Sequence, residues 1–396
     1  MSSFSRSSYA LLAVNLNTMI GAGIFVYPAL IAAAAQSMGF LSFGAVFCIM
    51  LPLVLAIAQL AILHPTGAGG LYIYGKEALG NHVGILTSII YFLAKALSCS
   101  IMIRIFVVNL LMVFPALSAI PLFVLRISAL AFLLVLNLFG LRFGLRIQAG
   151  FVVLKLIPLL IVVAGGIFIF NSANLSLLPT SFDRFVSTLP LALYPMMGFE
   201  TCCAVGHISL DAKRMAYAVV GSFLFVTLLY MLMQFFLFAA VGTGLFGSLT
   251  PLTLFFNALF KGAGQLFFTL LGVLAIMISA LGSAYSILYS ASWYPFAIGK
   301  EFKSSFMTTV NRYGSPVAAL IIHTAIIALF LLLPDKMGAL GRLSVFGCLV
   351  IYATMACALL AMYKKRSQDI KLPYWVAILS LVSCGYIAFS CIKDLL

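Results

Sequence analysis

The chain has 396 residues, of which 64% are hydrophobic and only 8% are charged, and its mean hydropathy is +1.22. A sequence of this composition cannot cover a soluble globule with polar side chains, so it predicts a polytopic integral membrane protein. The net charge of +14 is not taken to indicate a nucleic-acid partner, because the Lys and Arg residues lie in short clusters between apolar runs, as in cytoplasmic loops.

Eleven apolar runs of about 20 residues or more follow one another along the chain. Each run is bounded by charged residues, Pro, Gly or Asn, and each predicts one membrane-spanning helix. The runs cover residues 9–34, 41–63, 82–113, 121–140, 147–170, 185–207, 216–241, 263–299, 315–334, 339–362 and 373–392. The segments between them are too short for a soluble domain, so residues 1–396 are predicted to form a single transmembrane domain.

The basic residues between the runs and near their ends predict the orientation. With a cytoplasmic N-terminus, thirteen of them lie on the inner side and five on the outer side, the five being Arg184, Lys261, Lys336, Arg342 and Lys393. Cytoplasmic loops carry the excess of Lys and Arg, so we expect the N-terminus inside. The lack of long tails and of glycosylation-ready outer loops is compatible with a bacterial inner (plasma) membrane.

The first run is interrupted at residues 15–28, which read Asn-Leu-Asn-Thr-Met-Ile-Gly-Ala-Gly-Ile-Phe-Val-Tyr-Pro. Two glycines and a proline allow a helix to stop and restart here. Lipid tolerates a broken backbone only where the freed N–H and C=O groups line a cavity or find partners. The interruption therefore predicts a binding site.

A second interruption lies in the sixth run, where Pro195 and Gly198 precede Glu200. Glu200 is the only acidic residue within a predicted helix. Breaks that stand five helices apart are typical of a five-plus-five inverted repeat with its site between the repeats. We expect repeat one at about 9–170, repeat two at about 185–362 and an extra helix at about 373–392.

Four motifs resemble those of the amino acid, polyamine and organocation (APC) transporters. Gly21-Ala22-Gly23-Ile24-Phe25 resembles the Gly-x-Gly-Ile-Phe of their first helix, and Gly198-Phe199-Glu200 the Gly-Phe-Glu of their sixth. The segment 311–316 is similar to their Asn-x-x-Gly-x-Pro, and 211–214 to their Asn-Pro-Lys-Arg loop. The resemblance implies a leucine-transporter-type fold and secondary transport, with no enzymatic activity, cofactor or metal. We expect the family's usual twelfth helix to be absent, and Pro195 and the Cys202-Cys203 pair depart from the pattern.

Lys155 lies in the fifth run among apolar neighbours, where an unpaired charge is costly. By resemblance it matches the lysine whose ammonium replaces a sodium ion in sodium-independent members and braces helix one against helix eight. A lysine removed from water can also alternate between charged and neutral forms, which suits proton coupling. The alternative is a side chain that snorkels to the surface. Glu200 is expected either to titrate or to hydrogen-bond the broken backbone of helix one.

The helix breaks suggest how an α-amino acid would bind. The carboxylate would accept hydrogen bonds at the first break, Gly21 to Ile24, from the N–H groups of Ala22, Gly23 and Ile24, and the ammonium would bind the carbonyls of Tyr194 and Met197. Side-chain selection would fall to Met196, Phe199, Ser98, Cys99, Ala280 and Ser283. For each of these, ordinary helix packing is the alternative. Lys95 is deep enough to face the cavity, whereas Arg104 is expected to reach the outer surface.

The leading hypothesis is an alternating-access transporter of neutral, apolar amino acids, acting as a proton symporter or as an exchanger against a counter-substrate, and forming a monomer or homodimer. A basic amino acid or polyamine antiporter is disfavoured because the core holds no second acid. A channel or sensor on the same fold is a further alternative, but a channel needs a continuous polar lining.

Two further segments are not simple loops: 64–74 is expected to be re-entrant or interfacial, and 249–260 an outer amphipathic helix.

Overall fold

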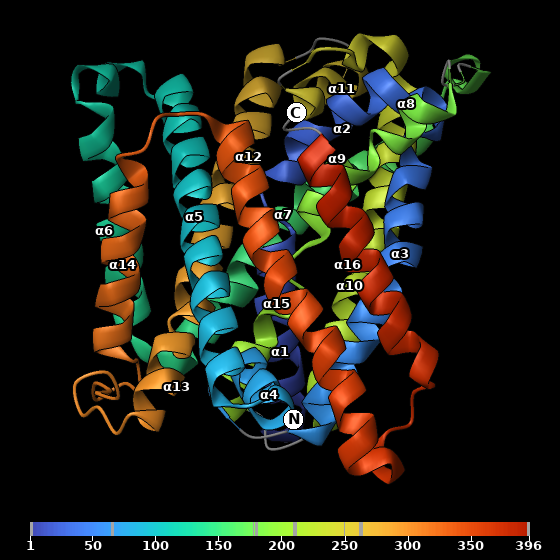
Figure 1. The fold of residues 1–396 in the computed structure, drawn as a ribbon. Coiled ribbons are helices and arrows are strands. Elements are labelled where there is room, and N and C mark those ends of the chain that lie inside the picture. Colours follow the sequence, from blue (N-terminus) through green and yellow to red (C-terminus); the bar gives the residue numbers. More distant parts are fainter. Residues whose placement is uncertain are drawn as a thin grey trace.

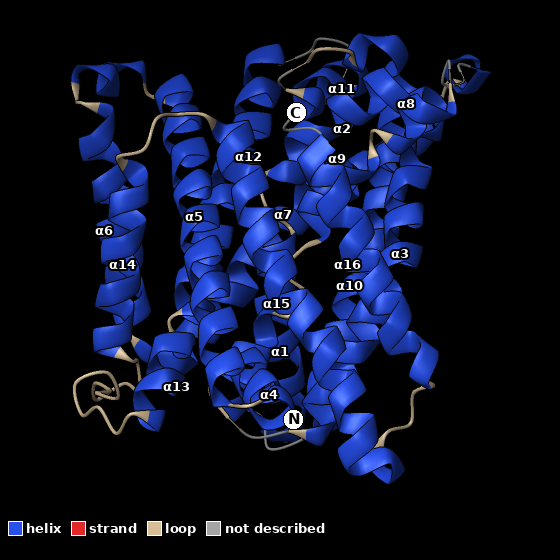
Figure 2. Ribbon diagram, viewed as in Figure 1, coloured by secondary structure: helices blue, strands red, loops and turns tan. Residues whose placement is uncertain are grey.

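The computed structural model describes residues 3–64, 67–176, 178, 181–208, 212–248, 250–260 and 264–393. These residues form a bundle of helices (Figures 1 and 2). Within these ranges there is no strand, and β-pairing is limited to one isolated bridge between Val310 and Pro316. The all-α membrane fold predicted from the sequence is confirmed.

The helices have the following bounds. The α-helices are α1 Ser3–Met19, α2 Gly23–Ala35, α3 Gly39–Leu63, α4 Gly70–Leu79, α5 Asn81–Val113, α6 Leu122–Leu138, α7 Gly140–Phe168, α8 Phe182–Val186, α9 Leu189–Met196, α10 Ala212–Val241, α11 Pro251–Leu259, α12 Gln265–Ala291, α13 Trp293–Glu301, α14 Val317–Leu331, α15 Met337–Arg366 and α16 Tyr374–Lys393. The 3-10 helices are η1 Gln36–Met38, η2 Pro115–Ala119, η3 Ser172–Ser176, η4 Thr201–Ile208, η5 Gly242–Leu245 and η6 Ser367–Asp369.

Each predicted apolar run contains helix, but the boundaries differ in three places, the first being α1, which begins at Ser3 rather than at 9. The run 263–299 is divided between α12 and α13, which are separated at Ser292, and α7 begins at Gly140 rather than at 147. Six helical segments of the described chain are long and apolar enough to cross a membrane, and one of them, Gly23–Leu63, contains both α2 and α3. Three further apolar helices are shorter, at Leu122–Leu138, Val317–Leu331 and Tyr374–Phe389.

The two ends of the bundle carry different short helices. The N-terminus, α4 and α13 lie at one end, whereas α2, α8 and α11 lie at the other (Figure 1). The segment 64–74, expected to be re-entrant or interfacial, leads into the short helix α4; Pro65 and Thr66 are outside the described residues. The expected amphipathic helix is α11, which buries Leu252, Phe255 and Phe256; Leu249 is outside the described residues.

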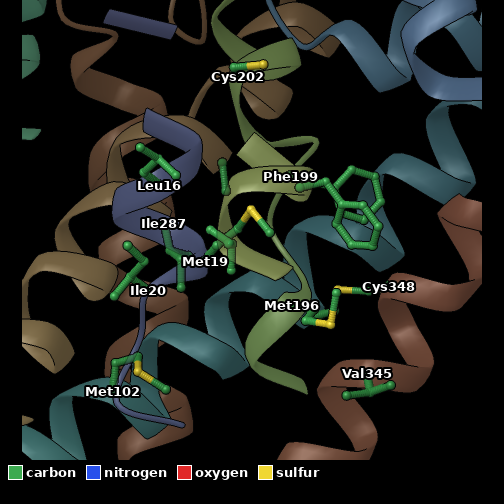
Figure 3. Close-up of a cluster of buried hydrophobic side chains, with 14 of the residues drawn as sticks. Leu16, Met19, Ile20, Met102, Met196, Phe199, Cys202, Ile287, Val345 and Cys348 are labelled. Carbon is green, nitrogen blue, oxygen red and sulfur yellow. The ribbon is translucent and has the colours of Figure 1, made fainter. Parts of the chain in front are cut away.

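Helix α1 runs through the middle of the bundle and packs on α7, α10 and α12. One large cluster of buried apolar side chains extends around it. Figure 3 shows part of this cluster, including Leu16, Met19 and Ile20 at the end of α1. Large apolar side chains also lie exposed on the outside of the bundle, among them Phe168 and Phe389. An apolar interior combined with an apolar exterior is what a lipid environment requires, so the protein is an integral membrane protein.

Candidate transport site

The first helix break lies between the last residue of α1, Met19, and the first residue of α2, Gly23. Within the described chain, no hydrogen bond is donated by the backbone N–H groups of Ala22, Gly23 or Ile24. The freed carbonyls, by contrast, have partners. Ser279 donates to the carbonyl oxygen of Ile20 at 2.8 Å, and Tyr230 donates to that of Met19 at 3.0 Å. The break therefore offers donors to a ligand, while the carbonyl oxygens of Met19 and Ile20 are already occupied.

The second break lies between α9 and η4. Met197 is extended, and Gly198 has a φ of +113°, a region that only glycine adopts readily. A Cβ at Gly198 would also lie 2.7 Å from Cγ2 of Thr18. Glycine is required here for both reasons, and its close approach brings the second break against α1.

Asn15, in the helix that ends at the first break, forms hydrogen bonds to the backbone at the second break. Its amide nitrogen donates to the carbonyl oxygen of Phe199 at 2.5 Å, and its amide oxygen accepts from the N–H of Cys202 at 2.7 Å. The same amide nitrogen lies 3.1 Å from Oγ of Ser222 in α10. One buried side chain of α1 thus satisfies the backbone that the second break exposes.

A small cavity of about 50 Å³ lies between the breaks and is bounded by α5, α12 and α15. The lining combines hydroxyl groups with apolar side chains and consists of Thr18, Met19, Gly21, Gly23, Lys95, Ser98, Met102, Tyr194, Pro195, Met197, Ser283, Ile287, Ser344, Val345 and Cys348.

The structure brings half of the sequence-predicted substrate residues to this cavity. The six that line it are Gly21, Gly23, Ser98, Tyr194, Met197 and Ser283. The other six are buried outside the lining, namely Ala22, Ile24, Cys99, Met196, Phe199 and Ala280. Ala22 and Ile24 were predicted to bind only through their backbone N–H groups, which lie at the first break.

Phe199 and Cys99 are directed into packing instead. The ring of Phe199 stacks on Tyr352 at a centroid distance of 5.7 Å and meets the edge of Phe223 at 5.2 Å. The thiol of Cys99 faces the carbonyl oxygen of Ala284 at 3.5 Å. Met196 and Phe199 belong to the apolar cluster in Figure 3. Residues at adjacent positions of a broken helix point to different sides, which residue type alone does not reveal.

Lys155 is fully buried and joins three helices. Its ammonium in α7 donates to the carbonyl oxygen of Asn17 in α1 at 2.7 Å and to Oγ of Ser283 in α12 at 3.1 Å. Ser283 itself donates to the same Asn17 oxygen at 2.9 Å. The side chain therefore points into the bundle instead of snorkelling to its surface.

Glu200 lies in a buried ion pair with Lys95 of α5. The Nζ–Oε1 distance is 2.9 Å, and the hydroxyl of Tyr91 donates to the same oxygen at 2.6 Å. The other carboxylate oxygen accepts from the N–H of Gly198 at 3.2 Å. The partners of Glu200 are thus on α5 and in its own break, and the expected hydrogen bond to the backbone of the first helix is not among its contacts in the described chain.

Arg104 differs from the expectation that it reaches the outer surface, because its side chain is fully buried. Its guanidinium donates to the carbonyl oxygens of Phe330 and Leu333 at 2.7 and 2.8 Å and forms an ion pair with Asp335. Arg126 binds the other oxygen of Asp335 at 2.7 Å. The carbonyls at the end of α14 hold the guanidinium inside the protein.

Sequence reasoning missed the contribution of α15 to the cavity. Ser344 and Cys348 are four residues apart, which places them on one face of this helix. Oγ of Ser344 lies 2.5 Å from Oγ of Ser98 on α5. The sequence signal that could have revealed this contribution was the placement of Ser344 four positions before Cys348 in the run 339–362. The side chain of His207, for which the sequence favours a capping or loop role, is outside the described residues.

Comparison with known protein families gives a match over residues 4–392, to a family described as amino acid permease. The chain belongs to the amino acid permease family. The match covers nearly the whole chain, so the resemblance to APC transporters seen in the four motifs is confirmed. Membership points to transport across a membrane rather than to catalysis.

Individual relatives agree with this family. The serine/threonine exchanger SteT of Bacillus subtilis is 26% identical over 382 residues, covering 91% of this chain and 83% of SteT. An uncharacterised transporter of Mycobacterium tuberculosis and another of Mycobacterium bovis are each 24% identical over 385 residues, covering 95% of this chain and 84% of theirs. This permease is therefore an amino acid transporter by family.

Proposed function

We propose that this permease is a sodium-independent secondary transporter of neutral amino acids that works by alternating access. The observation that carries the proposal is the cavity between the two helix breaks. At one side it meets the unbonded N–H groups at the start of α2, and at the other the end of α9. An α-carboxylate and an α-ammonium group would each have backbone partners there. The five-plus-five repeat, with breaks in its first and sixth helices, is part of this proposal.

The position of Lys155 supports the proposal that transport does not depend on sodium. Its ammonium lies on the carbonyl oxygen of Asn17, next to the first break, where a cation would be held by backbone oxygen. A resident cation leaves no need for a bound metal ion. Loss of its proton would weaken the contact between α1, α7 and α12, so Lys155 is the proposed coupling residue of a proton symporter or an exchanger, with Glu200 as the second ionisable group of the site.

The cavity lining supports a neutral substrate side chain. Among the lining residues none is acidic, and Glu200 behind them is already paired with Lys95. The apolar part, with Met102, Ile287 and Val345, would take an aliphatic side chain. The hydrogen-bonded pair of Ser98 and Ser344 favours a second candidate, exchange of serine and threonine as the name of SteT describes for that relative.

Binding to the purified protein tests this proposal. Thermal unfolding in detergent would be followed with each of the common amino acids and with putrescine, with and without sodium. We expect neutral amino acids to raise the melting temperature equally in both salts. Uptake of the best ligand into proteoliposomes, driven by a pH gradient or by preloaded amino acid, then separates symport from exchange. Stabilisation only in sodium, or only by putrescine, would contradict the proposal.

We also propose that the end carrying α4 and α13 faces the cytoplasm of a bacterial inner membrane, as the distribution of basic residues favours. Labelling of single cysteines by a membrane-impermeant thiol reagent in intact cells tests the orientation. A cysteine at Lys300 on α13 should be protected, and one at Lys336, before α15, should react. Reaction at Lys300 and protection at Lys336 would reverse the assignment.

A further inference from the structure

The ion pair of Lys95 and Glu200 lies at the edge of the cavity, with the lysine on the cavity side and the glutamate behind it. Lys95 belongs to the lining, whereas Glu200 is fully buried and does not. The Lys95 ammonium is held on the far side by Oε1 of Glu200 at 2.9 Å, and it lies 5.0 Å from the centre of the Tyr91 ring. A ligand in the cavity therefore meets the lysine, behind which lies Glu200.

The carboxylate is built to hold a cation at this position. Besides Lys95 it has a hydroxyl donor in Tyr91 and an N–H donor in Gly198, and all three keep it ionised and oriented. The ring of Tyr91 offers a π face to the same cation. These are the groups that a protein uses to recognise the ammonium of a ligand, and here a side chain of the protein occupies them.

We propose that Lys95 is the residue that excludes cationic substrates, because its ammonium is a tethered cation in the position that the side-chain ammonium of a basic amino acid or of a polyamine would take. This inference rests on the proposed function, of which it specifies the substrate class. A second cation in the cavity would meet the Lys95 charge with no acid left to balance it. Removal of the lysine side chain opens a cation site in front of Glu200.

Two substrates with the same carbon chain test the exclusion in the unaltered protein. Lysine is norleucine with an ammonium group added at the terminal carbon. Binding would be followed by competition against the best neutral ligand of the wild-type protein. We expect norleucine to compete at least about tenfold more strongly than lysine, since the charge is repelled and must lose its water. Equal competition by the two, or stronger competition by lysine, overturns the inference.

The variant Lys95→Ala tests the cation site itself. The probe is n-butylammonium, which has the four-carbon chain and ammonium of a lysine side chain, of which alanine keeps only Cβ, and no amino acid backbone. We expect n-butylammonium to stabilise Lys95→Ala against heat and to leave the wild type unchanged. Lys95→Ala should also bind lysine at least about tenfold more tightly than the wild type does. The double variant Lys95→Ala/Glu200→Gln should lose both effects.

Lys76→Ala is the matched control. It removes a lysine from another ion pair, with Glu301, outside the cavity. It should gain neither n-butylammonium nor lysine binding. The inference is overturned if Lys95→Ala folds but is not stabilised by n-butylammonium. It is also overturned if Lys95→Ala does not fold even in the presence of n-butylammonium while the double variant folds.

The two proposals fail in different ways. Absence of stabilisation by every neutral amino acid in the wild type contradicts the proposed function, but it leaves the n-butylammonium test of Lys95→Ala intact. Conversely, binding of neutral amino acids by the wild type, together with no response of Lys95→Ala to n-butylammonium, retains the function and rejects the role of Lys95.

Discussion

The ammonium of Lys155 and the backbone carbonyl oxygen of Asn17 are joined by a hydrogen bond of 2.7 Å, across 138 residues of sequence. Ser283 donates to the same oxygen from α12 at 2.9 Å. A carbonyl near the first helix break is thus held by a charge on one helix and a hydroxyl on another. This contact is the place where protonation of one side chain could alter the packing of α1.

Lys155→Met should abolish coupling to a pH gradient. Methionine keeps most of the volume but has no proton to exchange, so accumulation in proteoliposomes with a gradient should fall to the level without one. The stability loss should stay near 1 kcal/mol, because Ser283 still satisfies the Asn17 carbonyl. The control is Lys300→Met, an exposed lysine on α13. Undiminished accumulation by Lys155→Met would reject the coupling role.

Gly23→Val should weaken the binding of all substrates alike. A Cβ at Gly23 would lie 3.1 Å from the ring of Tyr27 and 3.3 Å from that of Tyr194, at the mouth of the first break. The added methyl groups would shield the free N–H groups, so affinities should drop at least about tenfold, or 1.4 kcal/mol. Isothermal titration with several amino acids measures this.

A glycine in an open position provides the comparison for Gly23. A Cβ added at Gly221 in α10 would meet no neighbouring side chain within 4 Å, so Gly221→Val should leave affinities unchanged. Loss of binding for one amino acid only in Gly23→Val would mean that the first break selects the side chain instead of holding the carboxylate.

Arg104→Met should destabilise the protein by about 3 kcal/mol, because two carbonyl oxygens at the end of α14 lose a charged donor. Arg126→Met should cost less, since the Asp335 carboxylate that it binds is 47% exposed and keeps Arg104 as a partner. Melting temperatures of the two variants in detergent check the order. Equal losses would show that the carbonyl contacts contribute little.

Lys76→Ala should have a small effect that depends on pH. The hydrogen bond to Glu301 raises the pKa of Lys76, so the pair stabilises the fold at neutral pH and loses this contribution as the pH rises through the raised pKa. Both side chains are about one-third exposed, so the loss at pH 7 should be below about 1 kcal/mol. The melting temperatures of wild type and variant should converge at strongly alkaline pH.

Local features of the sequence were enough to predict the class of protein and the positions of the two helix breaks. Apolar runs report membrane helices because a helix in lipid must satisfy its own backbone, and this depends only on consecutive residues. Glycines and prolines at 21–28 and 195–198 report breaks for the same reason. The charge of Lys155 and Glu200 in such runs marked them as residues with partners.

The identity of those partners was decided by the tertiary structure. Lys95 and Glu200, or Ser98 and Ser344, are more than a hundred residues apart and meet only because of how α5 is rotated against the second break and α15. Rotation also sends Phe199 into packing while Met197, two residues before it, faces the cavity. The sequence by itself determined that the chain has two broken helices; helix packing, which sums many weak contacts, decided which side chains line the cavity between them.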